Sequence, residues 1–356
     1  MAFESVVGQE RARAIAEAWL RSGRIPHAIL LCGPEGVGKR QFALALAGAL
    51  LCAEQRMLAC GACPSCRQMA GGSHPDLHFL LPLRAKRGRK SLDPQEIRAA
   101  AQDYLSGGEL GGQTNIAIEQ LRQMQRDMSY APSAGGRKVA VIFAAERMHP
   151  AGANSLLKIL EEPLADSLLI LVSSAPERML PTVLSRCQRL ALRPLSAQVV
   201  RAELEAMRVT GPALELGVRL GGGSVQRARA AATGAWDETR DRVEQFIEAG
   251  LRCEDAVYWD TVEELAGDRP LQDQFLELCA LYLRDVFLLH HARDGAGTMV
   301  DRSAYCARVG NALDGDSIER AMLEIDRAAE AMERNASLQL VLSDLWRCLR
   351  RAGRAA

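Results

Sequence analysis

A glycine-rich stretch near the N-terminus constrains the fold of this chain more than any other feature. Residues 33–39 read Gly-Pro-Glu-Gly-Val-Gly-Lys; they follow the short apolar run 28–32 and precede the almost entirely apolar, helix-like stretch 40–51. Glycines placed between a strand and a helix let backbone N–H groups surround a phosphate, and the lysine adds a positive charge. The stretch therefore predicts an α/β domain built around a phosphate-binding loop.

The residues that should complete this loop with magnesium are missing. The position after the lysine normally carries a hydroxyl that holds the metal, but here it is Arg40. The apolar run 139–143 ends in Ala144 and Ala145, where such a fold would place an acidic pair for magnesium and water. Glu146 would restore an acid only if the strand ended later than the pattern indicates.

The sequence thus predicts a chain that keeps the nucleotide-binding architecture and lacks the hydrolytic chemistry. The degenerate nucleotide-binding set comprises Gly33, Gly36, Gly38, Lys39 and Arg40. ATP with magnesium is left open as a cofactor, because the glycines and the lysine are intact while the ligands of the metal are not. A loop that retains its glycines only for turn geometry is the alternative interpretation.

Apolar runs of strand length alternate with helix-like stretches through the first half of the chain. Strands are expected at 28–32, 77–81, 139–143, 168–172 and 190–192. Because helices such as 151–162 separate them, we expect a parallel sheet with helices on both faces, in an order that the pattern does not give. After Pro194 only helical periodicity remains, which predicts a small and then a larger helical domain.

The second half contains helix-like stretches separated by glycine clusters. Two short stretches, 214–220 and 226–232, flank the glycines at 221–223. Longer helices are expected at 237–249, 271–293 and 317–351. We expect the last of these to be one continuous helix.

Four of the ten cysteines form the sharpest chemical motif in the chain. Cys60, Cys63 and Cys66 are spaced as two overlapping CxxC steps, and Cys52 stands at the end of the preceding helix-like stretch. Four thiolates close a tetrahedral zinc shell without an open position, which is typical of a structural site. A redox pair or four unrelated thiols are the alternatives, but a redox motif does not need four cysteines.

Charge and hydropathy exclude several functional classes. The chain has 44 basic and 44 acidic residues, so its net charge gives no general attraction to nucleic acid, and any DNA contact has to be local. The basic run 84–90 is expected to be a solvated loop, with contact to DNA phosphates as the alternative. Residues 1–8 show no signal-peptide pattern, and no apolar run approaches the roughly 20 residues that span a bilayer, so we expect a cytoplasmic protein.

The segment Ser185-Arg186-Cys187 permits two interpretations. Taken alone, an arginine in such a turn is usually solvated or paired with a carboxylate at the surface. In an oligomeric nucleotide-hydrolysing machine, Arg186 could instead reach the γ-phosphate of a neighbouring subunit and stabilise the charge of the transition state. Only the family context separates the two.

Several short stretches distributed over nearly the whole chain form a recognisable set. They are 7–10 (Val-Gly-Gln-Glu), 26–28 (Pro-His-Ala), the glycine loop, the four cysteines, 74–76 (His-Pro-Asp), 153–163 (Ala-Asn-Ser-Leu-Leu-Lys-Ile-Leu-Glu-Glu-Pro), 184–187 (Leu-Ser-Arg-Cys) and 334–340 (Arg-Asn-Ala-Ser-Leu-Gln-Leu). Together they resemble the subunits of the bacterial DNA polymerase III clamp loader, a family of AAA+ proteins. The last three stretches are very specific to clamp-loader subunits.

The resemblance implies an AAA+ fold in three parts. These are a RecA-like α/β domain at 1–194 with a zinc module at 52–66, a small helical lid at 195–235, and an all-α collar at 236–356 that holds a pentamer together. The implied partners are the ATPase subunits and the delta subunit of a hetero-pentamer, the sliding clamp, and primed DNA through the complex.

The resemblance also implies the role of this subunit in DNA replication. It implies a subunit without intrinsic ATPase activity, within a DNA polymerase holoenzyme (a nucleotidyltransferase), that offers Arg186 to the adjacent ATPase subunit, flanked by Ser185 and Cys187. Gln226 occupies the lid position where active subunits carry a nucleotide-sensing arginine.

Two other functions compete with this one. An ATP-hydrolysing clamp-loader subunit would use Lys39 with a nonstandard metal site, and Arg40, Ala144 and Ala145 all argue against it. A standalone zinc-dependent DNA-binding protein would need a strongly basic face, which the balanced charge does not supply.

Overall fold

The computed structural model describes residues 6–54, 58–83, 94–106, 108, 115–133, 136–291, 297–333 and 336–355. The chain divides into two compact units, Met1–Val199 and Val200–Ala356. The basic run 84–90 lies outside the described residues, and so do Arg334 and Asn335 of the C-terminal signature. The separate lid and collar boundaries, 195–235 and 236–356, stay predictions.

A five-stranded parallel sheet in the order β2-β3-β4-β1-β5 forms the centre of the first unit. Its strands are β1 (Ala28–Cys32), β2 (Leu77–Leu80), β3 (Lys138–Ile142), β4 (Ser167–Ser173) and β5 (Gln188–Ala191). The strands expected from the apolar runs are confirmed, and so is the α/β fold class. The order is new information, because it places β4 between β1 and β3 although β4 follows them in the chain.

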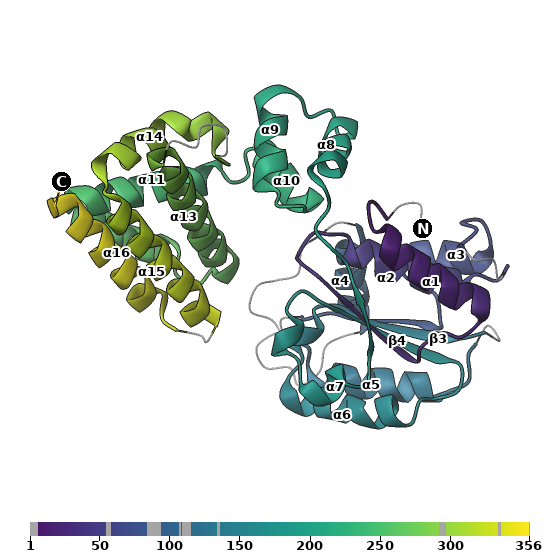
Figure 1. Ribbon diagram of the computed structural model, residues 1–356. Helices are drawn as coiled ribbons and strands as arrows, with labels where there is room; N and C mark the ends of the chain where they lie inside the picture. The colour runs from purple at the N-terminus through teal and green to yellow at the C-terminus, as the bar shows by residue number, and fades with distance from the viewer. Residues whose placement is uncertain are drawn as a thin grey trace. The chain divides into compact units, whose positions relative to one another are not determined.

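Successive side chains of the central strands pack into two separate cores. On β1, Ile29 and Leu31 belong to one core, whereas Leu30 belongs to the other, because neighbouring strand residues point to opposite faces. The first core is covered by α1 (Glu10–Ser22), α2 (Lys39–Leu51) and α4 (Pro94–Ser106), and the second by α5 (Ile118–Ser129), α6 (Pro150–Glu161) and α7 (Pro181–Leu184), as Figure 1 shows. Burial on both faces explains the uninterrupted apolar strand sequences.

The carboxyl ends of the parallel strands meet at one edge of the sheet. There the glycine loop follows β1, the short 3-10 turn η2 (Ala145–Arg147) follows β3, and a second such turn, η3 (Pro176–Arg178), follows β4. Ligands of open α/β sheets bind at this edge, between connections that leave the sheet in different directions. The fold therefore brings the glycine loop and the residues after β3 to the same side of the sheet.

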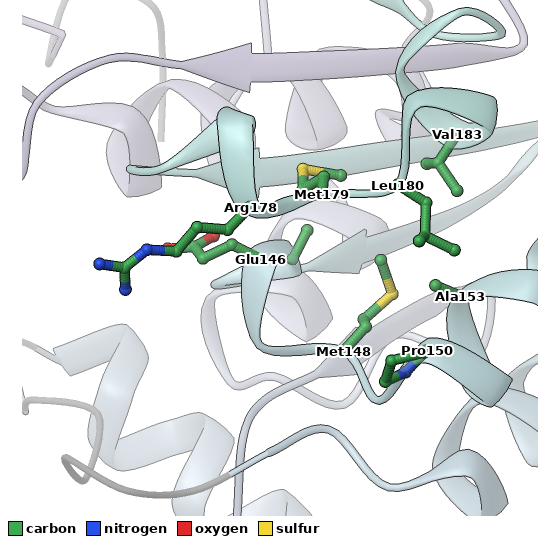
Figure 2. A pocket seen from close by; sticks show the side chains of 9 residues that line it. Glu146, Met148, Pro150, Ala153, Arg178, Met179, Leu180 and Val183 are labelled. Carbon is green, nitrogen blue, oxygen red and sulfur yellow. The ribbon is translucent and has the colours of Figure 1, made fainter. Parts of the chain in front are cut away.

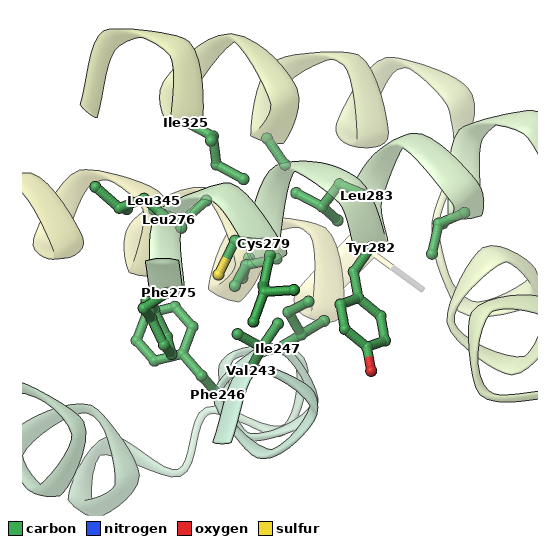
Figure 3. Packing of buried hydrophobic residues seen from close by; sticks show 14 of the residues in the cluster. Val243, Phe246, Ile247, Phe275, Leu276, Cys279, Tyr282, Leu283, Ile325 and Leu345 are labelled. Atoms are coloured by element: carbon green, nitrogen blue, oxygen red, sulfur yellow. The ribbon is translucent and has the colours of Figure 1, made fainter. Parts of the chain in front are cut away.

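The second unit is entirely helical in its described part. Its helices are α8 (Ala197–Ala206, which begins just before the boundary), α9 (Gly211–Leu220), α10 (Val225–Ala232), α11 (Asp237–Arg252), α12 (Asp255–Glu264), α13 (Arg269–His290), α14 (Ser303–Ala312), α15 (Gly315–Glu333) and α16 (Leu338–Ala355), with a 3-10 turn, η4 (Val300–Arg302), before α14. Figure 3 shows the central packing, in which Phe246 of α11 meets Phe275 of α13, while Ile325 and Leu345 come from α15 and α16.

The single helix expected at 317–351 is wrong. The structure has two helices, α15 and α16, that lie side by side and pack against each other (Figure 1). Both bury an apolar stripe in the same core, through residues such as Ile318 and Leu342, so each of the two stretches has the apolar spacing of a helix. Among the described residues, no helix combines the length and the apolar character that a membrane crossing requires.

Candidate functional site

The glycine loop has a backbone that only glycine can adopt at its key positions. Gly33, Gly36 and Gly38 have φ angles of 152°, 73° and 99°, all in the region that side chains disfavour. A Cβ atom at Gly33 would lie 2.2 Å from the backbone oxygen of Leu192, because the strand segment after β5 passes directly beside the loop. Gly33 is thus required by the packing of the fold as well as by any phosphate, whereas nothing lies within 4 Å of a Cβ atom at Gly38.

A buried glutamine fastens the loop to the rest of the sheet. The Nε2 atom of Gln9 donates to the carbonyl of Val37 at 3.1 Å and to that of Arg193 at 2.7 Å, and its Oε1 accepts from the N–H of Arg193 at 3.1 Å. Gln9 was noted in the sequence only as part of a family resemblance. This role could not be found locally, because its partners are 28 and 184 residues away.

The lysine of the loop turns inward. Its Nζ donates to the carbonyls of Gly33 at 2.7 Å and Pro34 at 2.6 Å, and the residue is only 8% exposed. Burial lowers the pKa of Lys39 to about 8, although the nearby carboxylates of Glu35 and Glu146 oppose that shift. The ammonium group of Lys39 is therefore held by the carbonyls of its own loop.

The Arg40 side chain is hydrogen-bonded to backbone carbonyls at the C-terminal end of helix α4. Its Nη1 donates to the carbonyl of Tyr104 at 2.5 Å and to that of Gly108 at 3.0 Å, and its guanidinium lies 4.6 Å from the centre of the Tyr104 ring. Tyr104 in turn meets Phe143 edge-on, with ring centres 4.9 Å apart. A cation at a helix C-terminus satisfies carbonyls that lack partners in the helix, so Arg40 supports the fold at a position where a hydroxyl would hold a metal.

The residues after β3 form one wall of a mostly apolar pocket. The strand ends at Ile142 and is followed by Phe143, Ala144 and then η2, which contains Ala145 and Glu146. Glu146 accepts a hydrogen bond from the N–H of Ser174 at 3.3 Å through Oε1, and its Oε2 is buried without a hydrogen-bond partner in the part of the chain that the structure describes. Figure 2 shows Glu146 and Arg178 at one end of this pocket and Leu180, Val183 and Ala153 at the other.

The four cysteines come together at the far end of α2. Cys52 ends that helix, and Cys63 begins α3 (Pro64–Ala70), with Cys60 before it and Cys66 on its first turn. Their sulfur atoms all lie within 4.8 Å of one another; Cys52 and Cys63 are 4.0 Å apart, and Cys60 and Cys66 are 3.9 Å apart. Tetrahedral zinc with Zn–S bonds of about 2.3 Å requires sulfur separations of about 3.8 Å, so the geometry fits zinc.

Backbone N–H groups support the thiolate form of these cysteines. The N–H groups of Cys60, Cys63 and Cys66 donate to the sulfurs of Cys52, Cys60 and Cys63, at 3.5, 3.3 and 3.4 Å. The hydrogen bond from the Cys66 N–H lowers the pKa of Cys63 to about 6, while burial raises that of Cys66 to about 12. A divalent cation would overcome the second effect, because its charge favours deprotonated sulfur.

Arg186 lies at the surface, just beyond the short helix α7. Its Nη1 donates to the carbonyl of Thr182 at 2.9 Å and to the hydroxyl of Ser185 at 3.3 Å, and its Nη2 is 2.7 Å from a carboxylate oxygen of Glu161. The Arg186 side chain is 36% exposed. Cys187 is buried, and burial raises the pKa of its thiol to about 11, so it acts as a packing residue.

The structure thus contains three separate sites. Lys39 begins α2 and Cys52 follows its last residue, which puts the loop and the cysteines about 20 Å apart along that helix. The described contacts join Arg186 to α6 and α7, and Lys39 to its own loop. Arg186 thus lies at the surface, held by Thr182, Ser185 and Glu161, and none of its described contacts joins it to the glycine loop.

Comparisons with known proteins show which family this chain resembles. Residues 8–196 match the family model described as DNA polymerase III, delta subunit. The chain is 24% identical over 342 residues to DNA polymerase III subunit delta' of Bacillus subtilis, covering 95% of this chain and 94% of that protein. It is 36% identical over 202 residues to subunit delta' of Pseudomonas aeruginosa, covering 56% of this chain and 53% of that one. A solved DNA polymerase III gamma subunit-related protein of Thermotoga maritima aligns with a TM-score of 0.43 at 16% identity, over 95% of this chain and 99% of that one.

Proposed function

Since the chain belongs to the DNA polymerase III delta-subunit family of AAA+ clamp-loader proteins, we propose that it is a subunit that does not hydrolyse ATP and that supplies Arg186 to the site of a neighbouring ATPase subunit. The observation that carries the proposal is a contrast within one domain. The glycine loop has lost its metal ligands, while the half-exposed Arg186 keeps a supported position at the surface.

The environment of the loop supports the absence of hydrolysis. Phosphoryl transfer needs magnesium on the phosphates and a residue that positions the attacking water. Arg40 offers no hydroxyl and is engaged by the α4 carbonyls, and Ala144 and Ala145 offer no carboxylate after β3. What remains in the loop is a buried lysine and a set of backbone N–H groups, which suit binding better than chemistry.

The position of Arg186 supports the role in trans. An arginine inserted into a neighbour's site stabilises the negative charge that develops on the transferred phosphoryl group. In this chain the guanidinium is presented at the surface by the carbonyl of Thr182 and the hydroxyl of Ser185, while Cys187 anchors the segment in the core. Those two neighbours position the arginine and do not take part in the chemistry.

The four cysteines would hold a structural Zn²⁺ ion. Cys52, Cys60, Cys63 and Cys66 supply a complete set of sulfur ligands in a fitting geometry. Zinc bound in this way supplies folding free energy and offers no open position for a substrate. The four cysteines would in this way fix the end of α2 to the start of α3 and stabilise this part of the domain.

Residues 236–356 would provide the collar of a hetero-pentamer with the ATPase subunits and the delta subunit. The large apolar core shared by α11, α13, α15 and α16 supports a rigid helical block of this kind. In the assembled complex, in the cytoplasm, the subunit would help to open the sliding clamp and to place it on primed DNA. The division into 1–194, 195–235 and 236–356 belongs to this proposal.

An ATP-hydrolysing subunit is the second candidate, and one observation favours it. Lys39 is intact, and Glu146 lies just beyond β3 with a buried carboxylate oxygen that has no partner among the described residues. A metal could in that case be held by Glu146. The hydrogen bond from Ser174 and the missing hydroxyl at Arg40 weigh against it.

ATP hydrolysis by the isolated chain with magnesium, compared with a Lys39→Ala variant, separates the two candidates. The proposed function predicts no turnover by either protein above the level of a buffer control. Turnover that the Lys39→Ala change abolishes would establish the chain as an ATPase and would refute the proposal.

A further inference from the structure

One carboxylate holds the arginine that the proposed function depends on. Glu161 is the last residue of α6, and its Oε1 lies 2.7 Å from Nη2 of Arg186. The two residues come from different elements, which are packed together through the core beneath them. The contact is thus a tertiary ion pair, set by the packing of α6 on α7.

The ion pair involves one terminal nitrogen of the Arg186 guanidinium, and the other terminal nitrogen also has partners within the chain. Nη1 of Arg186 donates to Thr182 and Ser185, whereas Nη2 faces Glu161. Thr182 and Ser185 are neutral partners, so among the described residues the carboxylate that pairs with this positive charge is that of Glu161. An arginine neutralised in this way presents less charge to a phosphate than a free one does.

The exposure of the pair makes it exchangeable. The Arg186 side chain is 36% exposed and that of Glu161 is 52% exposed. Exposed ion pairs contribute little free energy and are screened by salt, whereas an arginine gains much more from a phosphate, which it can contact with two parallel hydrogen bonds. The negative charge that develops on a phosphoryl group transferred in another subunit would therefore displace the carboxylate.

We propose that Glu161 is a positioning residue that restrains Arg186 until the charge that develops in the transition state of the neighbouring site competes for it. This inference rests on the proposed role of Arg186 in trans. Glu161 touches neither nucleotide nor metal; it sets how much of the time the arginine is free. Removing its charge should raise the turnover of the neighbouring site in the resting complex, before clamp and DNA are added.

The expected change is modest and has a distinctive form. Because exposed ion pairs shift an equilibrium by about two- to five-fold, the Glu161→Gln variant should raise kcat of the clamp loader by about that factor. KM for ATP should not change, because an arginine that acts on the transition state alters kcat and not ground-state binding. The increase should shrink as the salt concentration rises, since salt weakens the same ion pair in the wild type.

The experiment is steady-state ATP turnover by the reconstituted complex containing the full-length chain. It compares Glu161→Gln, Arg186→Ala and the matched control Glu162→Gln, which removes the same charge from the next residue, an exposed one at the end of α6. Thermal unfolding of each variant alone reports whether it folds. A rise in kcat for Glu161→Gln and none for Glu162→Gln would support the restraint.

Three results would overturn the restraint. Unchanged or lowered kcat in Glu161→Gln would mean that the carboxylate does not hold the arginine back. An equal rise in Glu162→Gln would assign the effect to surface charge in general. If Arg186→Ala itself left turnover unchanged, the proposed function would fail first, which separates that failure from the failure of Glu161 alone.

Discussion

The two ends of helix α2 carry sites that differ in how complete their sets of ligand residues are. At the start of the helix, the phosphate loop keeps its three glycines and Lys39 but has Arg40 where a metal ligand belongs. At its end, all four sulfurs of the cysteine cluster lie within 4.8 Å of one another. The difference teaches that a loop glycine such as Gly33 is needed for packing whether or not the loop takes part in chemistry, whereas four converging thiols are the arrangement that a metal site needs.

The largest effect should come from the cysteine cluster. Zinc that binds only the folded form stabilises it by about 4 kcal/mol when its concentration is 1,000 times Kd. The Cys63→Ser variant should lose bound zinc and most of that stabilisation, as measured by elemental analysis and by urea unfolding of the purified chain. A Cys348→Ser variant, outside the cluster, serves as the control and should keep its zinc. A wild-type protein purified without zinc, yet as stable as one saturated with it, would contradict a structural metal.

The next largest effect tests whether packing preserves the glycine loop. Gly33→Ala would place a Cβ atom 2.2 Å from the Leu192 oxygen, at a φ of 152°. Overpacking and backbone strain together should destabilise the chain by about 3 kcal/mol, even without nucleotide. Gly38→Ala is the control, because nothing lies within 4 Å of its Cβ position and only its φ of 99° costs free energy. Equal unfolding free energies for both variants would break the packing argument.

The Arg40→Thr variant tests whether the missing hydroxyl alone would account for the proposed absence of ATP hydrolysis. We expect no hydrolysis to return, since Ala144 and Ala145 still provide no acid after β3. The free energy of unfolding should fall by about 2 kcal/mol, because the carbonyls of Tyr104 and Gly108 lose a charged donor. Chemical denaturation and an ATPase assay on the same preparation measure both. Recovery of turnover would show that the domain needs only one residue to become an enzyme.

The smallest effect concerns the protonation of Lys39. Burial lowers its pKa to about 8 in the free chain, and phosphate groups beside it would raise that pKa. Nucleotide held by the loop should therefore bind with uptake of a proton, so that affinity falls by up to about tenfold as the pH rises from 7 to 9. Titration with a fluorescent ATP analogue at three pH values checks this, with Lys39→Met as the control. Wild-type affinity that stays constant over this range would remove Lys39 from the binding site.

Local sequence patterns predicted the elements of the first unit because its strands are buried on both faces. Runs such as 28–32 and 139–143 contain apolar residues without interruption, which is typical of parallel strands in an α/β sheet. The close spacing of Cys60, Cys63 and Cys66 likewise made the cysteine cluster predictable, since ligands near in sequence meet around one turn. The strand order was not predictable, because nothing in a single strand records its neighbours.

The contacts that define the sites could not be predicted from the sequence, because they join residues that lie far apart in the chain. Gln9 holds the loop through Arg193, Arg40 reaches Tyr104, and Glu161 pairs with Arg186, all across long stretches of chain. Such pairs follow from tertiary packing and leave no periodic signal. The error at 317–351 has a related origin, because α15 and α16 face one core and each has the apolar spacing of a helix, which does not record that they are separate.

The central claim is that this chain contributes Arg186, and not its own phosphate loop, to ATP turnover. The most direct test compares Arg186→Ala with Lys39→Ala in the reconstituted clamp loader, measuring turnover by each complex under identical conditions. The account predicts that Arg186→Ala lowers turnover at the neighbouring site on the order of 10³-fold and that Lys39→Ala leaves turnover unchanged. The reverse pattern, with loss from Lys39→Ala and none from Arg186→Ala, would contradict it.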